Sequence, residues 1–161
     1  MRFRIGRVFC ALLLFVSIPV LAQDSKNVTD VLKEAGNCST FLKILQVGGM
    51  DAPSKPTDTF TIFAPTDDAI KKMNPADLKK LTGDASQARQ FVWCHQTFWK
   101  ETTAELEKAI GSKLTMMSGG SQPISKQGST FMIGSARIVK LDLHAIGTTI
   151  HLIDNVLCQP Q

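Results

Sequence analysis

The stretch TFTIFAPTDDAI at residues 59–70 constrains the fold more than any other part of this chain. Residues 59–63 combine threonine, phenylalanine and isoleucine, which have high strand propensity. Pro65 has no backbone N–H to donate, so a central strand must end there. Thr66 can then cap a helix whose first turn holds Asp67 and Asp68, where negative charge favours the positive end of the helix dipole. The segment predicts a strand, a sharp turn and a capped helix in immediate succession.

Helices are expected on both sides of this segment. Apolar residues at helical spacing predict one helix over residues 28–35 and a second over 39–47. After the segment, Asn74 as cap and Pro75 at the first helical position start another helix, and a further one is expected over 86–98. The faces expected to be buried in the second and last of these helices carry Phe41, Leu42, Leu45, Ala88, Phe91, Val92 and His95.

The pattern changes to short strands between turns from about residue 112 onward. The glycines of SGGSQ at 118–122 predict a hairpin turn, and TIHLIDNVL at 149–157 is expected to form the last strand. The chain contains no internal repeat and no segment typical of an interdomain linker. A helical half packed on a stranded half predicts an α+β domain.

Residues 1–22 have the features of a secretory signal peptide. Three arginines precede an apolar run over residues 8–18, and Ala22 offers a small residue at the cleavage point. The apolar run is too short for a membrane anchor, which needs about 20 residues. Residues 23–161 are then expected to form a single domain, exported to the periplasm or the extracellular space.

The positive charge of the chain belongs largely to the leader. The full chain carries 18 Lys+Arg against 14 Asp+Glu, a net charge of +4, and removal of the three leader arginines leaves 15 against 14, a net charge of +1. A nucleic-acid or anionic-membrane partner would require a more basic surface. We therefore expect no nucleic-acid partner and no stable membrane insertion after cleavage.

Three cysteines follow the leader, Cys38, Cys94 and Cys158. In an exported protein this number predicts either one disulfide with one leftover thiol or three unpaired thiols. Because Cys158 follows the last expected strand, a disulfide there would link the C-terminus either to Cys38 in the helical layer or to Cys94. The sequence leaves both pairings open.

Three segments of the chain, in this order, resemble signatures of the fasciclin domain family. TFTIFAPTDDAI resembles the first signature, a strand followed by FAPTN/D-x-AF, and Cys94-His95 falls where the family usually has a Tyr-His pair. DLHAIGTTIHLIDNVL resembles the closing signature, which ends in VIHVID-x-VL. The resemblance covers about residues 27–160 and implies a compact α+β fold with a small wedge of β-sheet flanked by several helices.

The resemblance also implies roles for particular residues. Asp67 would hydrogen-bond near His95 and tie the turn to the central strand, and the last strand would lie beside the strand containing Phe63. The structural signature positions implied in this way are Phe63, Pro65, Thr66, Asp67, His95, Ile150, His151, Ile153 and Asp154.

Departures from the family pattern limit what the resemblance implies. Cys94 replaces the usual tyrosine, which removes an aromatic hydroxyl from a segment implicated in adhesion in animal relatives. The chain contains no tyrosine and no Arg-Gly-Asp, so an integrin-binding role is not expected. Gly147-Thr148 stands where Asn-Gly is usual, so the turn before the last strand must be built differently.

Cys94, His95, His144 and His151 are the candidates for a metal site or a thiol-imidazole site. Zinc or copper would need three or four such ligands to converge. Adjacent side chains of an extended segment point to opposite faces, so Cys94 and His95 would not chelate one ion together. We expect His95 and His151 to be hydrogen-bonded structural residues, and we expect no metal, no cofactor and no enzymatic activity.

The leading hypothesis is therefore an exported, non-enzymatic module that binds a protein or a polysaccharide at the cell surface or in the matrix. Trp93, Cys94, His95 and Trp99 form the candidate binding segment, and Phe98 and Met116-Met117 could extend it into an apolar surface. The alternative, from a different class, is a periplasmic metal- or thiol-active protein that uses Cys94, His95 and His151.

Overall fold

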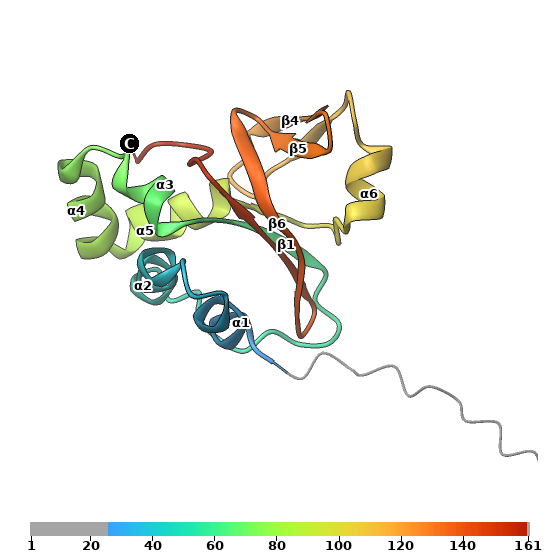
Figure 1. The fold of residues 1–161 in the computed structure, drawn as a ribbon. Coiled ribbons are helices and arrows are strands. Elements are labelled where there is room, and N and C mark those ends of the chain that lie inside the picture. The colour runs from blue at the N-terminus through green and yellow to red at the C-terminus, as the bar shows by residue number, and fades with distance from the viewer. Residues whose placement is uncertain (1–25, 161) are drawn as a thin grey trace, which may run out of the picture.

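The computed structural model describes residues 26–160, so the leader predicted at 1–22 lies outside the described residues (Figure 1). The helices are α1 (Val28–Ala35), α2 (Ser39–Val47), α3 (Asp67–Lys71), α4 (Pro75–Gly83), α5 (Ala85–Cys94) and α6 (Thr103–Lys108). The strands are β1 (Phe60–Pro65), β2 (Gln96–Thr97), β3 (Lys113–Thr115), β4 (Ser121–Gln127), β5 (Thr130–Ile133), β6 (Ala136–Ala145) and β7 (Thr148–Ile153). None of these helices is both long and apolar enough to span a bilayer.

The strands form one seven-stranded sheet in the order β2-β1-β7-β6-β5-β4-β3. Strands β1 and β7 are parallel and pair from Phe60 opposite Thr148 to Pro65 opposite Ile153, whereas the other neighbours are antiparallel. Phe63 lies opposite His151. The expectation that the last strand lies beside the strand containing Phe63 is therefore confirmed, and the α+β class is confirmed as well.

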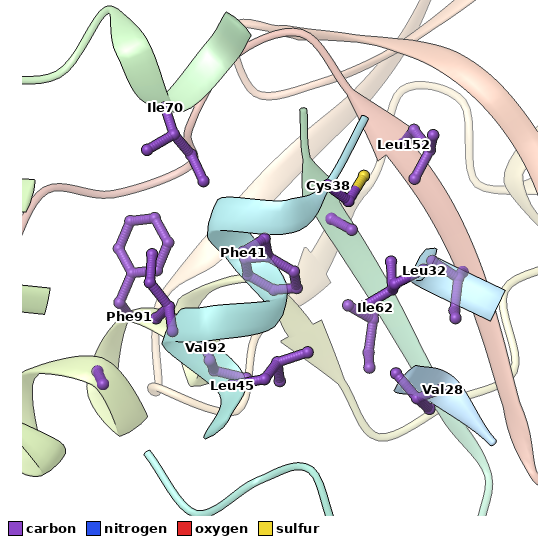
Figure 2. Close-up of a cluster of buried hydrophobic side chains, with 14 of the residues drawn as sticks. Val28, Leu32, Cys38, Phe41, Leu45, Ile62, Ile70, Phe91, Val92 and Leu152 are labelled. Carbon is purple, nitrogen blue, oxygen red and sulfur yellow. The ribbon is translucent and has the colours of Figure 1, made fainter. Parts of the chain in front are cut away.

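The larger hydrophobic cluster lies between helices α1 to α5 and one face of the sheet (Figures 1 and 2). Because side chains alternate along a strand, Ile62 of β1 and Ile150 and Leu152 of β7 share this face. Figure 2 shows Phe41 of α2 at the centre of the labelled side chains. Phe41 is completely buried, and burial of a side chain of this size stabilises the fold by about 1.5–3 kcal/mol.

A second hydrophobic cluster covers the opposite face of the sheet. Phe63 of β1 and Ile153 of β7 pack there against Leu106 of α6, Ile124 of β4 and Ile133 of β5. In Figure 1, α6 and the β4–β5 hairpin lie at the end of the molecule away from α2 and α4. The sheet thus separates two cores, and residues on opposite faces of β1 and β7 do not meet.

The local signals around Pro65 act as the sequence predicts. Pro65 is the last residue of β1, and the Ala69 N–H donates to Thr66 Oγ1 at 3.2 Å, so Thr66 caps α3. Asn74 caps α4 in the same way, since its side chain accepts the Ala76 N–H at 2.9 Å. These caps depend only on neighbouring residues, so the sequence is enough to place them.

Asp67 does not make the contact near His95 that the resemblance implied. Its carboxylate accepts hydrogen bonds from the Ser39 N–H at 3.2 Å, the Ser39 hydroxyl at 2.9 Å and the Thr40 N–H at 2.8 Å. Burial alone would raise the pKa of Asp67, but these hydrogen bonds outweigh it and hold the pKa below its ordinary value. Cys38 at the N-cap of α2 offers no side-chain cap, so Asp67 supplies it from a distant part of the chain.

Helix boundaries differ from expectation where strand pairing intervenes. Helix α5 starts at Ala85 behind its cap Asp84 and ends at Cys94, not at Phe98. It stops there because Gln96 and Thr97 pair with β1 as the edge strand β2. In α2, Leu42 is only half-buried, and Ile44 fills the expected core position.

Candidate functional site

The expected binding segment runs from the last turn of α5 through β2. Its members differ in how much surface they offer to a partner. Trp93 is 38% exposed, Phe98 52% and Trp99 68%, whereas Cys94 is half-buried and His95 is completely buried. We call Trp93, Phe98 and Trp99 the aromatic edge. The structure therefore keeps the two tryptophans and Phe98 as candidate contact residues, and it removes His95 from the surface.

The aromatic edge borders the open side of the sheet. Strand β2 is the terminal strand, and within the described residues it pairs with β1 alone. Two threonines hold the chain that follows β2. The hydroxyl of Thr61 in β1 donates to the Trp99 carbonyl at 2.7 Å, and the hydroxyl of Thr59, just before β1, donates to the Phe98 carbonyl at 3.5 Å. The backbone that carries the two most exposed aromatic rings is thus fixed against the sheet.

His95 has no nitrogen left for a ligand. Its Nε2 accepts the Leu157 N–H at 3.0 Å, so its Nδ1 carries the proton and donates to the Phe91 carbonyl at 2.8 Å. The ring packs 4.4 Å from the Phe91 ring and 6.0 Å from the Phe41 ring. Burial lowers the pKa of His95 to about 4, so the imidazole is neutral near pH 7 and joins α5 to the C-terminal segment.

His151 is used in the same way on the opposite face of the sheet. It stacks on Phe63 with ring centroids 5.5 Å apart, its Nδ1 accepts the Asp142 N–H at 3.2 Å, and its Nε2 donates to the Glu101 carbonyl at 2.6 Å. Burial lowers the pKa of His151 as well. Since the two histidines belong to different cores, they do not converge with Cys94 on one site. In the part of the chain that the structure describes, no group of three or more His, Cys, Asp or Glu side chains could hold a metal ion.

Asp154 also has a local structural contact. Its carboxylate accepts the Arg137 N–H at 2.7 Å and Arg137 Nε at 2.6 Å, which joins the end of β7 to the start of β6. Ile150 and Ile153 are completely buried, one on each face of the sheet. Asp154, Ile150 and Ile153 therefore make structural contacts within the fold.

Cys94 interacts with Cys158 and not with a histidine. The neighbouring Cys158 thiol lowers the pKa of Cys94, with a smaller contribution from Ser118, against the opposing effect of burial, while the proximity of Cys94 raises the pKa of Cys158. Cys38 is 1% exposed, and burial raises its pKa to about 11. Cys38, Cys94 and Cys158, the three cysteines among the described residues, are free thiols. The mutual effect of Cys94 and Cys158 on their pKa values favours the second of the two pairings that the sequence left open, Cys158 with Cys94.

Mild oxidation is expected to join Cys94 to Cys158 and to leave Cys38 as a free thiol. The reason is that a thiolate close to a second thiol reacts fastest, whereas a buried thiol of raised pKa is inert. Peptide mapping of the unreduced protein after treatment with diamide measures the pairing, and Cys158→Ser is the control that should yield no intramolecular disulfide. A Cys38–Cys158 peptide would contradict this arrangement.

The family model described as the Fasciclin domain matches residues 36–160. This chain belongs to the fasciclin domain family. The matched range contains the two signature segments, the Cys94-His95 pair and the whole aromatic edge. The fasciclin fold of this protein is also similar to a solved FAS1 domain pair from the insect cell adhesion molecule Fasciclin I, with a TM-score of 0.72 and 20% identity over 83% of this chain and 51% of that chain.

Curated relatives of this fasciclin-domain protein include animal and bacterial proteins. Transforming growth factor-beta-induced protein ig-h3 of Oryctolagus cuniculus is 24% identical over 149 residues, which are 91% of this chain and 21% of the relative. Immunogenic protein MPB70 of Mycobacterium bovis is 26% identical over 101 residues, which are 63% of this chain and 50% of the relative. The chain thus spans between about a fifth and a half of the length of these relatives.

Proposed function

We propose that this fasciclin-domain protein is an exported, non-enzymatic module that binds a protein or a polysaccharide at the cell surface or in the matrix. The observation that carries the proposal is the aromatic edge. Five large hydrophobic side chains are exposed among the described residues, and three of them, Trp93, Phe98 and Trp99, lie within one short segment. The other two, Ile110 and Val139, lie in other parts of the chain.

Exposed aromatic rings of this kind suit recognition of a partner. Tryptophan is enriched among the residues that contribute most to binding energy, because a rigid ring buries a large area at low cost in conformational entropy. An indole N–H can also donate a hydrogen bond at the rim of an interface or to a sugar hydroxyl. The bond from Thr61 to the Trp99 carbonyl keeps the backbone at this position ordered before the partner arrives, which lowers the entropy cost of binding.

The environment of the histidines supports binding over catalysis. A nucleophilic cysteine needs a nearby base with a free nitrogen, but both nitrogens of His95 and of His151 are engaged in hydrogen bonds. The same engagement weighs against the alternative of a metal- or thiol-active protein that uses these imidazoles with Cys94. Family membership and the description of Fasciclin I as an insect cell adhesion molecule support a role in attachment.

Loss of the aromatic edge is expected to weaken binding to the surface or matrix of the source organism at least tenfold. The test compares the native protein with the Phe98→Ala/Trp99→Ala double variant in binding to intact cells and to isolated matrix. Both side chains are more than half exposed, so their removal should leave the fold intact, and truncation of two such residues commonly costs more than about 1.4 kcal/mol of binding energy.

Val139→Ser is the matched control, because Val139 is an equally exposed apolar residue on β6. Treatment of the cells with protease or with periodate separates a protein partner from a polysaccharide. Unchanged binding by the double variant, or no retention of the native protein on any fraction, would overturn the proposal.

A further inference from the structure

We propose that a pocket on the helical face of the sheet binds a small, neutral aromatic molecule that carries one hydrogen-bond donor, and that Gln96 accepts the hydrogen bond. The pocket has a volume of about 340 Å³, which falls in the range of pockets that hold small molecules. It lies where β1, β2 and the start of β7 meet the helices α1, α2 and α5. The aromatic edge shares only Trp93 with it.

The floor of the pocket is built by four side chains of the sheet. Ile62 pairs with Gln96 across β1 and β2, and Phe60 pairs with Thr148 across β1 and β7. Paired residues of neighbouring strands, and residues two apart in one strand, point to the same face. Gln96 therefore shares the face of Phe60 and Ile62 and lines the pocket with them.

The walls are apolar and come from elements that are distant in sequence. They are formed by Val28 of α1, Leu45 of α2, Met50 in the loop after α2, Trp93 of α5 and Met117 after β3. Aromatic rings and thioethers make favourable contacts with a flat aromatic ligand. Among the described residues, Asp58 is the one charged residue that lines the pocket, and its carboxylate already accepts the Lys55 N–H at 2.7 Å. The lining therefore favours an uncharged ligand.

The polar partner that the ligand must match is the amide of Gln96. Gln96 is only 7% exposed, and its Oε1 is buried without a hydrogen-bond partner in the described part of the chain. Its backbone is already fixed, because the Gln96 carbonyl accepts the Met117 N–H at 2.8 Å. The hydroxyls of Ser54 and Thr148, which also line the pocket, bond to each other at 3.3 Å. Buried polar atoms in proteins are nearly always hydrogen-bonded. Rotation of the Gln96 amide about its terminal C–C bond would turn Oε1 toward the pocket, where a bound molecule can supply the missing hydrogen bond.

The experiment titrates the purified protein with indole and, separately, with 1-methylindole, and follows backbone amide shifts by NMR. Indole carries an N–H donor, and 1-methylindole has nearly the same aromatic body without it. We expect saturable shifts at residues lining the pocket and a dissociation constant for indole about five- to tenfold lower than that for 1-methylindole, as one neutral hydrogen bond to a buried acceptor provides.

Gln96→Met keeps the size of the side chain and removes the acceptor, so it should abolish the preference for indole. Met117→Phe should fill the pocket and weaken both probes, which gives a second result should Gln96→Met fold poorly. Trp99→Ala is the matched control and should bind both probes like the native protein, because Trp99 does not line the pocket. The proposal is overturned if neither probe binds saturably at millimolar concentration, or if the preference for indole survives in Gln96→Met.

Discussion

Replacing Gly147 with alanine is expected to lower the free energy of unfolding by about 4 kcal/mol, among the largest effects of a single methyl group in this protein. Gly147 has a φ of +64°, a conformation that costs a side-chain-bearing residue about 1–2 kcal/mol. A Cβ at this position would also meet the backbone carbonyl oxygens of Lys55 and Asp58, the latter at 2.8 Å. Backbone atoms cannot move aside as a flexible side chain can, so the turn between β6 and β7 or the loop at residues 55–58 would have to shift.

Gly128→Ala separates the two causes. Gly128 has nearly the same φ, +61°, but nothing lies within 4 Å of its would-be Cβ, so only the backbone cost of about 1–2 kcal/mol applies. Urea denaturation of both variants measures the difference between their free energies of unfolding. Equal losses of stability in the two variants would show that residues 55–58 do not pack against the turn as described.

Acidification from pH 6.5 to pH 4 is expected to lower the free energy of unfolding by about 3 kcal/mol through His95. Burial lowers the pKa of His95 to about 4 in the folded protein, whereas the unfolded chain titrates near 6.5. The unfolded state therefore binds the proton first as the pH falls. The stability from this group is fully present above pH 6.5 and is lost as the pH falls toward 4, at 1.36 kcal/mol per pH unit.

Other buried groups change the size of this loss of stability but not the pH range in which it occurs. His151 acts in the same direction, because burial lowers its pKa too, and Glu101 acts in the opposite direction, because burial raises the pKa of its carboxyl. Asp67, Asp142 and Asp154 have lowered pKa values, so the stability they contribute is lost only below about pH 4. The change in the free energy of unfolding between pH 6.5 and pH 4 therefore comes mainly from the histidines.

Urea denaturation as a function of pH, together with NMR titration of the His95 ring, tests this expectation. His95→Gln should flatten the pH dependence in that window, whereas His144→Gln, at an exposed histidine, should preserve it. A His95 ring that titrates near pH 6.5 in the folded protein would contradict its burial between Phe91 and Leu157.

Features set by neighbouring residues could be predicted from the sequence. Pro65 ends β1 and Thr66 caps α3, because proline lacks a donor and a threonine hydroxyl reaches its own helix start. Gly36 stops α1 with a φ of +80° for a similar local reason. The glycines after residue 117 mark the β3–β4 turn.

Features set by tertiary contacts could not be predicted in this way. Helical spacing alone would carry α5 to Phe98, but pairing of Gln96 with β1 ends it at Cys94. Asp67 bonds to the start of α2, which no pattern near Asp67 indicates. Helix α6 was not anticipated, although Thr102 followed by Glu105 has the spacing of a capping box that could have suggested it.

In the candidate site, too, some features could be predicted from the sequence and others depend on tertiary contacts. Trp93 and Trp99 are conspicuous in the sequence, and their exposure makes them candidate contact residues. The choice of Cys94 over Cys38 as the partner of Cys158 depends on where the C-terminal segment lies in the fold, because Cys94 and Cys158 are far apart in sequence. The pocket at Gln96 could not be foreseen either, since five separate elements contribute its walls.

The most direct test of partner binding through the aromatic edge is hydroxyl-radical footprinting of the protein, free and attached to the cell surface or matrix. Oxidation of each exposed side chain is quantified by mass spectrometry. We predict strong protection of Phe98 and Trp99, and weaker protection of the less exposed Trp93, with no change at Ile110 and Val139. Protection confined to Ile110 or Val139, with the aromatic edge oxidised as in the free protein, would contradict the account.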